Sequence, residues 1–301
     1  MDSGEPRGPQ ELGFPLLSDQ ILRLWTLEDL TRFQVNCGRQ LRQADGVLWA
    51  VSNSRFWVPL MTFDPIPGKG VHWPSHTALG FQAIVSEPER ATGWVQYLLV
   101  PDLPTYGVAR IGKVRRREIR RAAEHFEFRV LDTPEILMAQ GWRTLSEAAS
   151  RSGQSTPGSE AVYRGQWEAI YNHEPPLVIA ALREGVLHAY MVSYAAGGHV
   201  SFEQLAMDAS ARAHKAGAAL YWLHLSLWSS VPGVEFASFG RPYPERDSID
   251  FFKKSMGAQI AILPVVGRMR APVRWFLKRQ RPHAYERLVG MATASETGGP
   301  H

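Results

Sequence analysis

Apolar residues recur along the chain in two patterns, one with helical spacing and one in which every second position is apolar. In the first half, helical spacing after the capping residue Asp19 predicts a helix over about 20–43. Alternation predicts strands in GVLWAVS and RFWVPLM, joined by an Asn-Ser turn. The remaining predicted elements of this half are strands in FQAIVSE and WVQYLLV, a basic helix over 112–124 and a strand in FEFRVLD.

The second half repeats this mixture of helices and strands. Two helices are predicted over 134–150 and 160–172, followed by three strands in PLVIAALREGVLHAYMVSYAAGGHVSFEQLAM, a β-meander with glycine turns. The predicted order ends with a helix over 212–229, a strand in VEFASFG, a helix over 247–256 and a strand in AQIAILPV. Both halves therefore share a plan of helices around a mostly antiparallel sheet, which indicates two duplicated domains.

Composition narrows the class of protein. With 301 residues, 45% of them hydrophobic, the chain can bury the core of one large domain or two ordinary ones. The single cysteine, Cys37, excludes an internal disulfide framework and favours a reducing compartment. A signal peptide is not predicted, and no stretch approaches the roughly 18 consecutive apolar residues that span a membrane. We expect a soluble, cytoplasmic protein, with peripheral membrane attachment as the alternative.

The order of elements in the second half resembles an acyltransferase domain of the GNAT superfamily. Three segments are similar to its FemAB-like branch, whose members carry two such domains in tandem. They are KVRRREIRRAAEHFEFRV at 113–130, ALYWLHLSLWSSVPGVEFASFGR at 219–241 and FFKKSMGA at 251–258.

The resemblance implies an α/β (α+β) fold of tandem GNAT-like domains, each a mostly antiparallel mixed sheet flanked by helices. We expect an N-terminal domain over 19–131 and a C-terminal acyltransferase domain over 132–290. Residues 1–18 are rich in proline, glycine and charge and are predicted to be a mobile tail, and residues 291–301 a second tail.

The helix start after the meander carries positive charge and a glycine. It is similar to the GNAT loop R/Q-x-x-G-x-G/A, which binds the pyrophosphate of acyl-CoA, although a lysine replaces the first glycine. Unpaired N–H groups and the helix dipole favour an anion at such a position. The resemblance thus implies acyl-CoA as co-substrate, and the alternative is an ordinary basic helix start. The implied contacts are Arg212, Lys215, Ala216, Gly217 and Ala218.

Catalytic candidates come from the same resemblance. Many GNAT enzymes use a carboxylate on the strand before that loop as general base, and Glu203 lies on the matching strand. Because Glu203 and Gln204 point to opposite faces of a regular strand, only one can face the cleft. The alternative for Glu203 is a solvent-facing position. Where many GNAT enzymes carry a tyrosine as general acid, this chain has Phe251 and Phe252, which leaves Tyr243 as the nearest substitute.

Two further cations match the FemAB-like segments. Arg241 and Lys253 are implied to neighbour the acceptor or donor cleft, while Ser238 stands where that branch often has an aspartate. Arg241 could hold a carboxylate or phosphate through two parallel hydrogen bonds. The alternative is a structural ion pair with Glu245 or Asp247.

The helix over 113–121 gathers cations against one acid, Glu118. Such a face could bind tRNA or an anionic membrane surface, and the alternative is a solvated helix face. The cations of this run are Arg110, Lys113, Arg115, Arg116, Arg117, Arg120 and Arg121.

These observations together predict an acyltransferase that moves an acyl group from acyl-CoA to an amine, either a small molecule or a peptide. The alternatives are an aminoacyl-tRNA-dependent transferase of the FemAB kind and a non-catalytic GNAT-like binding module. Histidines without paired spacing and a lone cysteine do not match zinc-site patterns, so we expect no metal.

Overall fold

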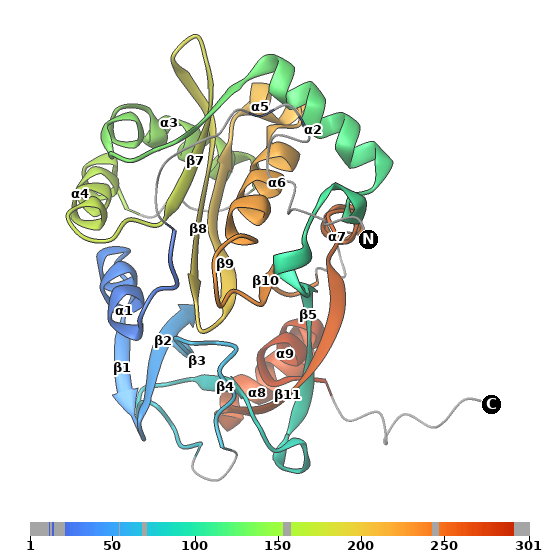
Figure 1. Ribbon diagram of the computed structural model, residues 1–301. Helices are drawn as coiled ribbons and strands as arrows, with labels where there is room; N and C mark the ends of the chain where they lie inside the picture. Colours follow the sequence, from blue (N-terminus) through green and yellow to red (C-terminus); the bar gives the residue numbers. More distant parts are fainter. Residues whose placement is uncertain are drawn as a thin grey trace. The chain divides into compact units, whose positions relative to one another are not determined.

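The computed structural model forms two compact units. Unit 1 combines Met1–Cys37 with Leu98–Gln259, and unit 2 combines Gly38–Tyr97 with Ile260–His301. The described residues are Leu12, Phe14, 22–53, 55–67, 71–152, 158–242 and 247–291. Each unit has its own set of paired strands with accompanying helices (Figure 1).

The sheet of unit 1 has the strand order β5–β10–β9–β8–β7–β6, where β5 contributes its last residues. β9 and β10 are parallel and the other pairs are antiparallel, so the sheet is mixed. The predicted meander is confirmed in β7, β8 and β9. The bounds are β5 Gly93–Val100, β6 Glu127–Val130, β7 Leu177–Arg183, β8 Val186–Ala196, β9 His199–Met207 and β10 Phe236–Ser238.

Helices cover both faces of this sheet, and the alternation of side chains along β8 assigns them (Figure 1). Met191 belongs to the core cluster that includes α6, which α2 contacts. Tyr190 and Tyr194 point the other way, to Trp167 of α4 and Phe33 of α1. The bounds are α1 Leu27–Asn36, α2 Lys113–His125, α3 Trp142–Ser152, α4 Glu160–Tyr171, α5 Ala209–Ala213, α6 Ala216–Trp228 and α7 Asp247–Ser255.

α6 is the central helix of unit 1 because it is apolar around almost its whole circumference. A helix of that kind is stable only when it is surrounded by protein. Trp222 and Trp228 are almost completely buried. The Nε1 of Trp228 donates to Ser193 Oγ at 2.7 Å, and that hydroxyl lies 2.6 Å from His224 Nδ1. Burial lowers the pKa of His224 to about 3, so its ring is neutral at physiological pH.

Unit 2 contains the strand order β1–β2–β3–β4–β11, with β3 and β4 parallel and the other pairs antiparallel. Trp49, Trp57 and Phe81 form part of its core. The bounds are β1 Leu41–Ala44, β2 Val47–Asn53, β3 Phe56–Pro59, β4 Gly80–Ile84, β11 Gln259–Met269, α8 Ala271–Gln280 and α9 Pro282–Val289.

Three sequence-based predictions differ from the structure. The helix predicted over 20–43 is only α1, because the apolar positions near its end belong to β1 and pair with β2. The proposed cap Asp19 lies outside the described residues. The helix predicted over 212–229 is broken between α5 and α6. In the predicted N-terminal tail, Leu12 and Phe14 are buried, and the ring of Phe14 packs edge-on against Phe128 at 5.3 Å.

The compact units do not follow the boundary predicted at residue 131. β6 precedes that boundary, yet it pairs with β7 inside unit 1. Unit 2 takes the strands between Gly38 and Tyr97 and the end of the chain. The extents of the two tandem domains stay a prediction.

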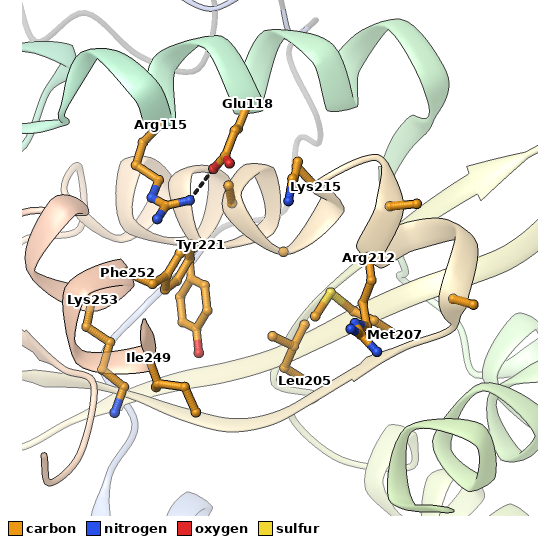
Figure 2. Close-up of a pocket in the computed structure, with 14 residues that line it drawn as sticks. Arg115, Glu118, Leu205, Met207, Arg212, Lys215, Tyr221, Ile249, Phe252 and Lys253 are labelled. Carbon is orange, nitrogen blue, oxygen red and sulfur yellow. Dashed lines mark hydrogen bonds and ion pairs between the residues drawn. The ribbon is translucent and has the colours of Figure 1, made fainter. Parts of the chain in front are cut away.

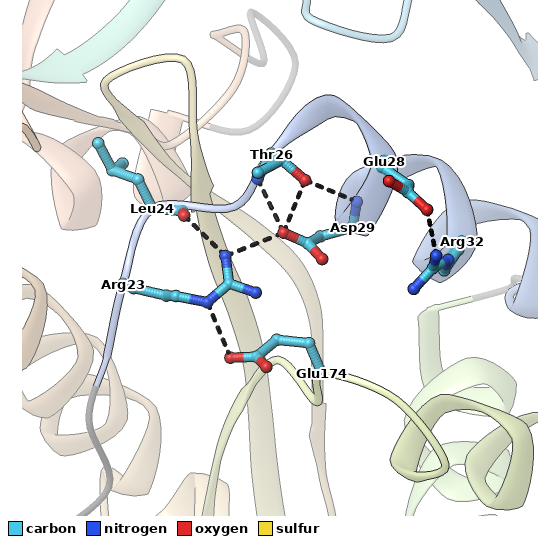
Figure 3. Close-up of polar contacts among 7 residues, drawn as sticks. All are labelled: Arg23, Leu24, Thr26, Glu28, Asp29, Arg32 and Glu174. Carbon is cyan, nitrogen blue, oxygen red and sulfur yellow. Dashed lines mark hydrogen bonds and ion pairs between the residues drawn. The ribbon is translucent and has the colours of Figure 1, made fainter.

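The start of α1 is held by a polar cluster on unit 1 (Figure 3). Thr26 and Asp29 form a capping box in which each side chain bonds the other residue's backbone N–H. Arg23 donates to Asp29 at 2.9 Å and also contacts Glu174 at 3.4 Å. Burial works to raise the pKa of Asp29, but the hydrogen bonds from Arg23 and Thr26 outweigh it and lower the pKa to about 2.

We therefore expect Asp29 to contribute pH-dependent stability. Because its pKa falls on folding, the contribution is fully present above the unfolded value of about 4 and is lost as the pH falls through about 2. Asp29→Asn should lower the free energy of unfolding by about 1 kcal/mol at neutral pH and flatten its decline in acid. Urea unfolding between neutral pH and pH 2.5 measures this. Glu28→Gln, in an exposed pair with Arg32 on the same helix, is the control and should change little. An unchanged acid profile in Asp29→Asn would contradict the assignment.

Candidate functional site

A cavity of about 710 Å³ opens in unit 1 (Figure 2). Its walls come from α2, the end of β9, the α5–α6 junction and α7. The apolar residues of the lining include Leu205, Met207, Ile249 and Phe252. The cavity thus joins an apolar surface to the charged start of a helix.

β9 borders the cavity beyond the point where its pairing with β10 stops. In the described chain, β10 pairs with β9 only over His199–Ser201, while β9 continues to Met207. Leu205 and Met207, in this extension, point toward the cavity (Figure 2). The divergence of two neighbouring parallel strands therefore produces the opening.

A β-bulge interrupts β9 at Glu203. Neighbouring residues Val192 and Ser193 of β8 face Gln204 and Phe202, so Glu203 is the extra residue. The bulge resets the alternation: the ring of Phe202 contacts α6, whereas Gln204 accepts a hydrogen bond from Tyr190 on the opposite face. Strict alternation, on which the sequence prediction relied, does not hold here.

The junction between α5 and α6 depends on one left-handed residue. Lys215 has φ 64° and ψ 26°, a conformation that turns the chain sharply between the two helices. Gly217 follows inside the first turn of α6, where a Cβ would lie 3.0 Å from the Sδ of Met207. The N–H of Ala218 donates to the carbonyl of Lys215 at 3.0 Å, and the dipole of α6 directs its positive end toward this junction.

The charged residues that line the cavity are mostly positive. Four cations face one carboxylate, Glu118, which gives the lining a formal charge of +3. His214, next to Lys215 in sequence, lies near a different set of cations: burial and the charges of His125, Arg121 and Arg183 lower its pKa. An anion is the ligand that this environment favours. The four cations are Arg115, Arg212, Lys215 and Lys253.

Arg115 is held in a fixed position on the cavity wall. Its Nε donates to Ser255 Oγ at 2.7 Å, its guanidinium lies 4.8 Å above the ring of Phe252, and it forms an ion pair with Glu118. The two charged side chains are only 14% and 16% exposed. Because these contacts restrain it, Arg115 is preorganised rather than a mobile surface charge.

The structure brings several of the predicted site residues together. Arg212, Lys215, Gly217, Ala218 and Lys253 all line the same cavity.

The other predicted residues lie elsewhere. Ala216 is completely buried beneath the junction, and Glu203 and Arg241 are half-buried but are not among the lining residues. The backbone carbonyl of Arg241 lies 3.4 Å from Lys253 Nζ, so its main chain positions that lysine. Tyr243 lies outside the described residues.

Two lining residues were not predicted to belong to this site, although Arg115 was counted among the cations of the basic helix. Tyr221 of α6 points its hydroxyl into the space, with its ring between Phe202 and Phe252 at 5.0 and 5.5 Å (Figure 2). It stands out in the sequence as a tyrosine in an otherwise buried apolar helix. Arg115 shares a helical face with Ile119 and Ala122, which are both buried, and this spacing was the available signal.

Two negative observations accompany this site. In the described part of the chain, no group of three His, Cys, Asp or Glu side chains is placed to hold a metal ion. None of the helices in the same residues combines the length and hydropathy that crossing a bilayer requires.

Solved structures share this architecture, although no protein-family model and no curated protein matches the chain. FemX is 10% identical, with a TM-score of 0.54 over 89% of this chain and 96% of its own. The C-terminal DUF2156 domain of an Agrobacterium fabrum protein assigned as a lysylphosphatidylglycerol synthetase is 12% identical, with a TM-score of 0.53 over 88% and 98%.

A tandem GNAT protein from the clavulanic acid biosynthesis pathway is 10% identical and has a TM-score of 0.44, over 75% of this chain and 81% of its own. At such identities the similarity concerns the fold. The chain shares with FemX and with the DUF2156 domain an α+β fold in which helices flank a mixed sheet.

Proposed function

We propose that the protein is a transferase that moves an acyl group from acyl-CoA to an amine, and that the cavity of unit 1 binds the donor. The observation that carries the proposal is the convergence of the α6 N-terminus with Arg212 and Lys215 on one cavity wall. The structures similar in fold, FemX among them, are consistent with a transferase of this broad class.

The phosphates of the donor fit the charged end of the cavity. The N–H groups at the start of α6 supply directed hydrogen bonds, and the dipole adds positive potential. Arg212 and Lys215 are exposed and able to adjust, while Arg115 is fixed by its neighbours. Gly217 lets Met207 pack closely against the start of α6, since a Cβ at this position would lie 3.0 Å from the Sδ of Met207.

The acyl-bearing arm fits the apolar side. Beyond Ser201, β9 runs on past its pairing with β10, and its edge at Leu205–Met207 lies along the cavity. An extended chain with amide groups can add to such an edge as a further strand does. Leu205 and Met207 then cover its carbon atoms.

Tyr221 is proposed as the acid of the reaction. The neutral amine attacks the thioester carbon, the C–S bond breaks, and the departing thiolate takes a proton. Tyr221 lines the cavity, and in this proposal its hydroxyl supplies that proton. Glu203 remains the proposed base that accepts the proton from the amine, acting from the bulge of β9.

An aminoacyl-tRNA donor is the second candidate. Arg117, Arg120 and Arg121 lie exposed on α2, the helix whose inner side carries Arg115 to the cavity. A nucleic acid on that outer face would place its end near the same site.

A non-catalytic binding module is the third candidate. The departure from the family pattern at Lys215, where the pattern has its first glycine, favours this candidate.

Charge reversal at the α6 junction tests the donor site. Lys215→Glu should weaken coenzyme A binding roughly tenfold or more, because it puts a carboxylate where the phosphates bind. Titration calorimetry at fixed ionic strength measures the dissociation constant. Arg164→Glu is the matched control, since Arg164 is an exposed arginine of α4 on the other face of the sheet. Equal affinities in the Lys215 variant and the wild type would show that the phosphates of coenzyme A do not bind in this cavity.

Substitution of the exposed α2 arginines distinguishes the two donors. The triple change Arg117→Ala, Arg120→Ala and Arg121→Ala should leave coenzyme A binding intact. If tRNA is the donor, each lost phosphate contact should reduce the log–log salt slope of its binding by roughly 0.7–0.9. Filter binding at several salt concentrations measures the slope. An unchanged slope would leave these arginines as a solvated face and contradict the tRNA candidate.

Tyr221→Phe tests the chemistry. Removal of the hydroxyl should lower kcat by about 10²-fold or more with little change in donor binding, because ring packing is kept and only the proton donor is lost. Glu203→Gln, in parallel, should lower turnover at neutral pH and leave donor binding nearly intact, because it removes the carboxylate that accepts the amine proton. Steady-state rates with acetyl-CoA and a panel of amines measure both. If Tyr221→Phe retains wild-type kcat across the pH range, Tyr221 is not the acid.

A further inference from the structure

A second surface, on unit 2, has a composition that the transferase proposal does not use. On α8, Trp275 and Phe276 are 65% and 52% exposed, an unusual position for two large aromatic side chains. The opposite side of the helix packs against the core of unit 2, where Val273 and Leu277 contact the cluster of Phe56, Met269 and Val289. The exposed pair is therefore the outward face of a docked helix.

Cations surround this aromatic pair. Within α8 and the residue after it, APVRWFLKRQR, there is no acidic side chain. The guanidinium of Arg279 lies 5.8 Å above the ring of Trp275, on the same outward face. Arg274 and Lys278 are exposed on the flank of α8, where the Nζ of Lys278 lies 4.9 Å from the ring centre of Tyr285 in α9, and Arg281 follows at the helix end. Apolar rings and positive charge thus share one side of α8.

We propose that this face of α8, defined by Arg274, Trp275, Phe276, Lys278 and Arg279, binds the surface of a bilayer that contains anionic lipid. Trp and Phe side chains enter the boundary between headgroups and acyl chains, while the cations bind the phosphates. The proposal concerns unit 2 alone and is independent of the reaction proposed for unit 1.

Other occupants fit the face less well. In a symmetric pair of chains each cationic face would meet its own copy, which brings like charges together. Residues 292–301, ATASETGGPH, contain no large apolar side chain that could cover the rings. Single-stranded nucleic acid stacks its bases on aromatic residues within a positively charged groove, whereas this pair stands on the outward side of a helix.

Vesicle flotation with the full chain tests the proposal. The wild type should float with vesicles of phosphatidylcholine and phosphatidylglycerol and bind far less to phosphatidylcholine alone. Trp275→Ser with Phe276→Ser should lower binding at least tenfold. Arg274→Gln, Lys278→Gln and Arg279→Gln together should lower it by about fivefold per cation and weaken its salt dependence. Trp275→Phe, which keeps an apolar ring, should retain most of the binding.

Matched controls separate this face from other surfaces. Phe251→Ser removes an exposed aromatic of α7, 67% exposed, and should not affect flotation. Thermal unfolding of each variant should match the wild type, since the changed side chains face solvent. Failure of the wild type to float, or full binding by the Trp275/Phe276 variant, would overturn the proposal. Loss of tRNA binding without loss of vesicle binding in that variant would also overturn it and assign the face to nucleic acid.

Discussion

The burial of α6 is the constraint on which unit 1 depends. Its sequence, AGAALYWLHLSLW, is apolar on nearly every side, so the helix is stable only when sheet and helices enclose it. That enclosure holds its N-terminus beside the end of β9, where the cavity opens. The hydrophobic burial that forms the core therefore also fixes the position of the charged α5–α6 junction. The charged side chains of that junction are not themselves stabilised by burial.

Three polar side chains inside this core form a hydrogen-bonded network that lies apart from the site. Ser193, His224 and Trp228 hydrogen-bond to one another, and burial keeps the histidine neutral. The charges lie instead at the end of the helix, where solvent reaches Arg212 and Lys215. The buried polar network of α6 is neutral, and the charges lie at its exposed end. The same helix can therefore stabilise the core and bind an anion.

The left-handed Lys215 links backbone geometry to ligand chemistry. A glycine would adopt this conformation without steric cost, whereas a lysine pays some strain and adds a positive side chain at the cavity. Arg115 shows the opposite strategy, because its contacts with Ser255, Phe252 and Glu118 fix the charge before any ligand arrives. The cavity thus combines a rigid cation with adjustable ones.

Much of the fold and part of the site could be predicted from the sequence. The meander, the basic helix and the buried helix follow from local periodicity and glycine turns, and the residues around Lys215 follow from the resemblance to a known loop.

Local pattern could not reveal the bulge at Glu203, because one extra residue in a strand leaves the alternation of apolar positions ambiguous. It also could not place Tyr221 and Arg115 together, since they are joined by the contact of α2 with α6 and by Phe252 of α7, which touches both. Composition and periodicity determined which elements form and which carry charge. Only tertiary packing decided which side chains face a shared cavity, because that choice depends on contacts between residues far apart in the chain.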